Sequence, residues 1–205
     1  MSGEIDTSQV LDNLLPDLHA DSYANLTYWT ESELYRFLDQ GAKQLANAAM
    51  MFVERDASQS TQPGVSGYPL PARYVATVHV SYGDRPLRPA TIIEMEARDP
   101  AFLSTEGAPD HWFQDDLALG IIGLAPVPDQ AAALPMLSSV TPPDLDLGST
   151  LLQAPAPVAI YLGYFVLAKC YGLEGESEQS DLAQHCAAKV QLLEQVFAKY
   201  YGEAG

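Results

Sequence analysis

The chain has 205 residues, 47% of them hydrophobic, which is enough apolar material for one sizeable domain or two small ones and excludes global disorder. Its formal net charge of −17 at pH 7 repels the phosphate backbone of nucleic acids and anionic membrane surfaces, which argues against nonspecific binding to either. Two cysteines, Cys170 and Cys186, are too few for a disulfide framework, and we expect both to be small core hydrophobes.

The sequence carries no recognisable targeting pattern. Its first ten residues, MSGEIDTSQV, have neither the basic nor the apolar region of a signal peptide. The most apolar stretch, residues 158–168, is too short to span a bilayer and is followed by Lys169. We therefore expect a soluble protein that is made in the cytosol and has no membrane partner.

The N-terminal part is predicted to be helical. Residues 6–19 form a short amphipathic pattern that Pro16 ends or kinks. Thr30 and Glu33 fit a capping box, which predicts the start of a long helix over about residues 31–55. The apolar residues of this helix form one stripe: Leu34, Phe37, Leu38, Ala42, Leu45, Ala48, Ala49 and Phe52.

Strands are predicted after a polar linker at residues 58–64, because glycine and proline recur there and the apolar runs become short. The clearest strand runs from Val75 to Tyr82 and alternates in character, and Gly83-Asp84 provides the turn after it. The remaining predicted elements are a return strand at 85–87, helical turns within 90–100, and strands at 112–114, 120–124 and 133–140.

Two helices are predicted to close the chain. Pro157 suits a first helical position, and residues 158–171 are apolar on nearly all faces, so this helix should be buried all round until Gly172 and Gly175 end it. The last helix is expected over about residues 177–201, with Gly202 just past its end. Its predicted buried stripe consists of Leu182, Cys186, Val190, Leu193, Phe197 and Tyr200.

The order of helices, strands and helices predicts an α+β fold. Residues 1–64 and 153–205 would form one discontinuous helical bundle, since neither helical half can bury its apolar stripe alone. Residues 65–152 would form a β-rich insertion, a small antiparallel sandwich or barrel-like sheet. We expect effectively one domain with an insert.

The sequence offers little for catalysis or metal binding, so we expect no catalytic residues, no cofactor and no metal. The four histidines lie in four different segments and no two have metal-face spacing. His185 and Cys186 are neighbours on a predicted helix, so their side chains diverge by about 100° and do not form a nucleophile and base pair. No GxGxxG, P-loop or GxSxG motif is present.

Two groups of carboxylates remain as candidates for chemistry. Asp110, Asp115 and Asp116 surround Trp112, and a second pair lies in PPDLDLG. Paired carboxylates can act as general acid and base or hold calcium. With 27 acidic residues in the chain, such groups are expected by chance, and we interpret both as solvated loops.

The residues from Trp112 onward share their order with a known family. An aromatic strand at Trp112-Phe113 is followed by the apolar strand of GIIGLAPVPDQ, which ends in Pro126-Val127-Pro128. A Pro143-Asp144-Leu145 segment, a proline-led helix and a long final helix complete the order. Upstream, YWTESELYRFLDQGAKQLA and GYPLPARYVATVHVSYGDRPLRPATIIEME continue it. Over about residues 25–201 the chain resembles the head-to-tail adaptor (head completion, or connector) proteins of tailed bacteriophages.

This resemblance implies a structural virion protein of the head-tail neck, made in the cytoplasm of a bacterial host. It implies a ring, usually twelve-fold, that contacts the portal protein and a tail or neck protein and lets DNA pass without binding it. A strand closed by two prolines would then serve as a stiff exit with no reactive group. We select five candidate interface or lumen residues: Asp144, Asp146, Tyr200, Tyr201 and Glu203.

Three alternatives remain open. A tail-completion or tail-terminator protein would bind tail tubes in place of portal rings. A small phage hydrolase would use Asp115 or Asp116 beside Trp112. A ligand-binding module would be a stable monomer with an apolar cavity under Trp112 and Tyr82.

Overall fold

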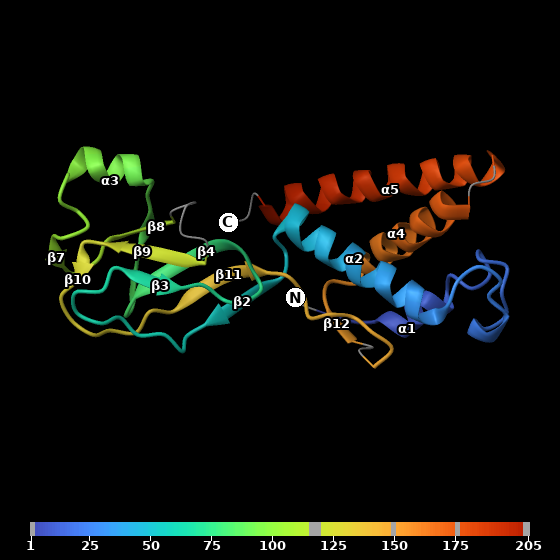
Figure 1. The fold of residues 1–205 in the computed structure, drawn as a ribbon, viewed down its shortest axis with the longest axis horizontal. Coiled ribbons are helices and arrows are strands. Elements are labelled where there is room, and N and C mark those ends of the chain that lie inside the picture. The colour runs from blue at the N-terminus through green and yellow to red at the C-terminus, as the bar shows by residue number, and fades with distance from the viewer. Residues whose placement is uncertain (1–2, 115–119, 149–150, 175–176, 203–205) are drawn as a thin grey trace. The chain divides into compact units, whose positions relative to one another are not determined.

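The computed structural model describes residues 3–114, 120–148, 151–174 and 177–202. It divides into two compact units, which Figure 1 shows as a helical and a β-rich part of the chain. The helical unit comprises Met1–Phe52 and Thr141–Gly205, and the β unit comprises Val53–Val140. The α+β class predicted from the sequence is confirmed.

In its described residues, the helical unit contains four α-helices and one short pair of strands. The helices are α1 (Thr7–Asp12), α2 (Glu31–Ala49), α4 (Pro157–Glu174) and α5 (Ser177–Gly202). Strands β1 (Glu4–Asp6) and β12 (Leu151–Gln153) pair antiparallel, and a 3-10 turn, η1, covers Tyr23–Asn25. Helix α2 packs on both α4 and α5, and α1 packs on α4.

Helix α2 begins as predicted and ends earlier than predicted. The Thr30 hydroxyl accepts a hydrogen bond from the Glu33 amide at 3.3 Å, and the Glu33 carboxylate accepts one from the Thr30 amide at 2.9 Å. The helix was expected to reach residue 55, but Met50 takes a left-handed conformation with φ +50° and ends it. The next residues, Val53–Asp56, form strand β2 because they find a backbone partner in the sheet.

Glycine allows α2 and α4 to approach closely within the helical core. A Cβ atom on Gly41 would lie 2.9 Å from Cδ1 of Phe165, closer than a real side chain allows. The buried side chains of α2, α4 and α5 form one continuous cluster with those of α1. Helix α4 is less enclosed than predicted, since Ile160 is 59% exposed, and it continues past Gly172 to Glu174.

The buried stripe of α5 also differs from its prediction. Cys186, Val190 and Phe197 are buried, as expected. Leu182 and Tyr200 are exposed, because at 100° per residue both lie at the edge of the side that α5 packs against α2 and α4.

The β unit contains two four-stranded sheets. One has the order β2 (Val53–Asp56), β11 (Met136–Val140), β4 (Tyr74–Tyr82) and β5 (Arg85–Pro86). The other has the order β3 (Gly67–Pro69), β9 (Ile121–Ala125), β8 (His111–Gln114) and β6 (Arg88–Pro89). All pairs are antiparallel except β6 with β8 and the separate pair β7 (Glu106–Gly107) with β10 (Val127–Pro128).

Side chains from both sheets share one core, which makes the β unit a small sandwich. Val80 and Met136 come from the first sheet, and Tyr68, Ile122 and Leu124 from the second. A second cluster lies under α3 (Ile92–Arg98), where Met95 and Phe102 pack with Phe113. The rings of Phe102 and Phe113 meet edge to face at 5.4 Å.

The unit boundaries in the structure lie at 52/53 and 140/141, whereas the sequence placed them at 64/65 and 152/153. Strand β2 joins β11 with its register at Met136↔Asp56, so residues 53–56 belong to the sheet. Strand β12 pairs with β1 at Leu152↔Ile5, so residues 151–153 belong with the helices. Neither pairing leaves a periodic signal that the sequence alone would reveal.

Candidate functional site

The segment with two prolines lies inside the β unit. Strand β9 ends at Ala125 as predicted, and Val127 then donates a backbone hydrogen bond to the carbonyl oxygen of Thr105 at 2.9 Å. Val127 is 4% exposed, and Pro128 is buried as well. The prolines therefore turn the chain from one strand pair into another, with their side chains held within the unit.

The predicted lumen residues Asp144 and Asp146 both have local partners. Asp144 accepts a hydrogen bond from Lys43 at 2.6 Å, and Lys43 also donates to Asp39 at 2.8 Å. These two carboxylates, Asp144 first, raise the pKa of Lys43. Asp146 accepts a hydrogen bond from the Gly148 amide at 2.8 Å. Both residues thus fix residues 141–148, and Asp144 holds that segment to α2, although its own side chain is 87% exposed.

The predicted aromatic residues at the end of α5 differ in environment. Tyr200 is 73% exposed and meets the ring of Tyr201 edge to face at 4.9 Å. Tyr201 is half-buried and stacks on Phe197 at 6.3 Å. Glu203 lies outside the described residues. Of the four predicted residues that the structure describes, the aspartates lie in the connector at residues 141–148 and the tyrosines lie at the end of α5.

An exposed apolar stripe runs along the other side of α5. Leu192, Val196 and Tyr200 are spaced four residues apart, so they lie on one side of the helix, and each is more than half exposed. Lys189 falls on the same side two turns earlier, and the exposed Lys199 flanks it. We call this surface the outer face of α5.

The outer face of α5 presents no carboxylate between residues 182 and 202. The sequence has one acid in this interval, Glu194, and its carboxylate accepts hydrogen bonds from Tyr161 at 2.8 Å and from Gln44 at 2.6 Å. Burial, and then the hydrogen bond to Glu194, raise the pKa of the Tyr161 hydroxyl well above its ordinary value. Glu194 therefore points into the bundle, which leaves cationic and apolar side chains outside.

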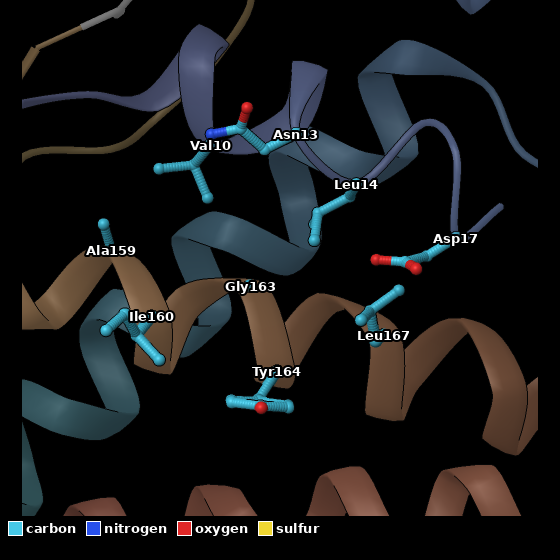
Figure 2. Close-up of a pocket in the computed structure, with 9 residues that line it drawn as sticks. All are labelled: Val10, Asn13, Leu14, Asp17, Ala159, Ile160, Gly163, Tyr164 and Leu167. Atoms are coloured by element: carbon cyan, nitrogen blue, oxygen red, sulfur yellow. The ribbon is translucent and has the colours of Figure 1, made fainter. Parts of the chain in front are cut away.

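A groove of about 340 Å³ lies between α1 and α4 (Figure 2). Its apolar lining comes from Val10, Leu14, Ile160, Gly163, Tyr164 and Leu167. Figure 2 shows Leu14 pointing toward Gly163, and Asp17 standing at the end of the groove beside Leu167. We call this the α1–α4 groove.

A polar cluster joins α3 to strand β8 in the β unit. His111 is 8% exposed, and its Nδ1 lies 2.5 Å from Oδ1 of Asp110. Nε2 lies 3.0 Å from Nη1 of Arg98. Because a guanidinium only donates, Nε2 is the accepting nitrogen and Nδ1 carries the proton that Asp110 accepts. Both ring nitrogens are therefore engaged, and the cluster clamps α3 onto the sheet.

The other residues singled out for chemistry do not form a site within the described structure. Asp115 and Asp116 lie outside the described residues, and Asp110 is engaged by His111. Tyr82 is buried in the sandwich core, where its hydroxyl donates to the carbonyl oxygen of Gln130 at 3.2 Å, and Trp112 packs against the same core. Both side chains thus contribute to the sandwich core, and a ligand cavity beneath them stays a prediction.

Two further features are absent from the described residues. Across residues 3–114, 120–148, 151–174 and 177–202, no three His, Cys, Asp or Glu side chains are grouped to hold a metal ion. In the same part of the chain, no helix has the length and apolar character needed to cross a bilayer.

The sequence reasoning missed both helical surfaces. The signal for the outer face of α5 was present, because residues 192, 196 and 200 have the spacing of one helix side, but Tyr200 was assigned to the buried stripe and Leu192 and Val196 were left unassigned. The α1–α4 groove had no such signal. Gly163 is a glycine within an apolar helix. Only the packing of α1 against α4 shows that the space beside it is a groove open to solvent.

The fold is that of an α+β protein with a small β sandwich, and its surface includes an exposed apolar helix face and an apolar groove between helices. A family model for SU10 adaptor protein matches residues 6–204, nearly the whole chain. The chain therefore belongs to the SU10 adaptor protein family, a family of phage head-to-tail adaptors, and the predicted resemblance is confirmed. It is a structural adaptor component of the phage virion. No curated protein gives a significant match.

Proposed function

We propose that this chain forms a ring, twelve-fold in the virion, between the portal at the capsid vertex and the tail. The family match over residues 6–204 carries the proposal. The ring contacts the portal protein on one side and a tail or neck protein on the other, after synthesis in the bacterial cytoplasm. Its role is structural, without catalysis, cofactor or metal.

The acidic composition supports a role as a DNA conduit. A net charge of −17 repels phosphate, so DNA passing through such a ring would meet little attraction during packaging and ejection. Asp144 and Asp146 are proposed to face the lumen, and Tyr200, Tyr201 and Glu203 to contact a partner.

Electron microscopy tests the proposed position. Purified protein is mixed with DNA-filled heads that carry a portal and lack the neck, and the expected result is a ring of density below the portal. Binding to isolated tail tubes with no binding to portals would show a tail-terminator protein instead. Asn substitutions at Asp115 and Asp116 should leave assembly unchanged, and loss of a hydrolytic activity without an assembly defect would overturn the structural role.

DNA ejection tests the lumen residues. We expect D144K and D146K together to slow ejection, because two cations per copy would attract the phosphates. The variant Lys43→Ala is the control, since it removes the partner of Asp144 without reversing the charge. Ejection at the wild-type rate from D144K/D146K particles would remove both residues from the lumen.

A further inference from the structure

Two exposed apolar surfaces lie on different helices of the helical unit. Both Figure 1 and Figure 2 show α4 between α1 and α5. The α1–α4 groove is lined by residues of α1 and α4, the loop after α1 included, and the outer face of α5 is formed by Leu192, Val196 and Tyr200. A protein that carries two different apolar faces can contact its copies head to tail.

The groove has the dimensions and lining of a site for apolar side chains. Its volume of about 340 Å³ accommodates several of them. Leu14 lies over Gly163 at the floor of the groove, since a Cβ there would meet Cδ2 of Leu14 at 3.5 Å, an ordinary contact. Ile160 at its edge is 59% exposed, which is a high fraction for a large apolar side chain beside a groove.

The two surfaces carry opposite charge. Residues 1–35 contain seven acids, Glu4, Asp6, Asp12, Asp17, Asp21, Glu31 and Glu33, and no lysine or arginine. Of these acids, Asp17 lines the α1–α4 groove and places a carboxylate at its end. The outer face of α5 presents Lys189 and Lys199 without a carboxylate, in a chain that has 27 acids against 10 basic residues. Opposite charges on the two faces favour this pairing and disfavour groove against groove.

We infer that the outer face of α5 in one copy docks into the α1–α4 groove of the next copy. Leu192, Val196 and Tyr200 supply the apolar contact, and the two lysines face the Asp17 end of the groove. Because the two faces differ, the contact is heterologous, and repetition of it closes a ring when the rotation permits. The inference rests on the proposed ring and identifies the surfaces that join its subunits.

Charged substitutions on each face test the inference. Ile160→Glu blocks the groove and Val196→Glu blocks the outer face, and both sites are more than half exposed, so the fold should tolerate them. Leu173→Glu is the matched control: it lies on α4, is 64% exposed, and lines neither surface. We expect each blocking variant to lower the fraction of portals with a ring about tenfold. The control should leave that fraction unchanged.

A charge-reversal experiment separates contact between copies from contact with the portal. Asp17→Lys alone and K189E/K199E alone should each reduce ring formation, and a chain with all three substitutions should recover it. Recovery requires that the two faces meet between identical copies. Far-UV circular dichroism and thermal melting establish that every variant is folded.

The outcomes distinguish the inference from the function on which it rests. If wild-type protein forms no ring below the portal, the proposed function fails and the inference with it. If wild type forms rings and the folded blocking variants do as well, the inference is wrong while the proposed function stands. Failure of the triple variant to recover, in a folded protein, also overturns the inference and assigns the faces to another partner.

Discussion

The two units of this chain are stabilised in different ways. The helical unit has one continuous apolar cluster that runs from α1 through α2 and α4 to α5. The buried apolar residues of the β unit fall into separate clusters, and polar side chains anchor its loops. The hydroxyl of Tyr68, for example, donates to the Val65 carbonyl oxygen at 2.7 Å, and that of Tyr74 donates to Gln114 at 2.5 Å.

This difference leaves the outer sides of the helices free for partners in one unit and requires fixed loops in the other. A continuous core stabilises the helices from within and leaves their outer sides free to carry apolar residues for partners. A small sandwich with divided cores needs its loops fixed, since loops otherwise cost conformational entropy. The two prolines and the Arg98–His111–Asp110 cluster fix such loops in the β unit.

The largest effect should follow from adding a side chain where the β sandwich has none. Gly123 on β9 pairs with Phe113 on β8, and a Cβ atom on Gly123 would overlap the Phe113 ring. We expect Gly123→Ala to destabilise the protein by about 3 kcal/mol, because the ring must leave a packed position. Denaturant unfolding measures the effect. Gly107→Ala, whose Cβ would meet Pro126 at 3.6 Å, is the control and should cost far less; equal costs would contradict the overlap.

Removal of the arginine that holds α3 should have the next largest effect. We expect Arg98→Ala to cost about 2 kcal/mol, because it leaves Nε2 of the buried His111 without its donor. Hydrogen exchange should increase in α3 and β8 and remain unchanged in α2 and α4. The control Arg85→Ala changes an exposed arginine of β5 and should cost under about 0.5 kcal/mol. Faster exchange in α2 and α4 as well would refute a local clamp.

A glycine in the helical unit tests the same kind of close approach with a smaller net effect. Gly41→Ala places a Cβ 2.9 Å from Phe165, but alanine also favours the helix by up to about 1 kcal/mol. We expect a net loss of about 1 kcal/mol in thermal or denaturant unfolding. Gly163→Ala meets only an ordinary contact at 3.5 Å and should be neutral or stabilising. A gain of stability in both variants would show that α2 and α4 can move apart freely.

The smallest effect concerns the two capping boxes, one in each unit. Hydrogen bonds from the Thr30 amide and hydroxyl lower the pKa of Glu33, and those from Thr91 lower the pKa of Glu94. A lowered folded pKa contributes stability above the ordinary value of 4.5, and this contribution disappears as the pH falls through the folded pKa. The variants Glu33→Gln and Glu94→Gln should therefore lose less stability than the wild-type protein as the pH falls from about 5 to about 3.

Melting temperatures across that pH range measure this effect, and hydrogen exchange assigns it to α2 or α3. At pH 7 each glutamine variant should melt slightly below wild type, because glutamine accepts the capping hydrogen bond without the charge, and the two melting temperatures should converge near pH 3. An unchanged acid profile in both variants would show that these carboxylates contribute nothing to the pH dependence.

The sequence by itself determined the α+β class, the starts of most helices and the family. These features depend on neighbouring residues: Thr30 and Glu33 cap a helix through groups three positions apart, and Gly83-Asp84 form a turn alone. The tertiary structure decided that residues 53–56 leave the helix for the sheet, that Asp144 pairs with Lys43, and which side of α5 stays exposed. Those outcomes depend on groups brought together from distant parts of the chain, as with Lys43 and Asp144. The spacing of neighbouring residues cannot predict such contacts.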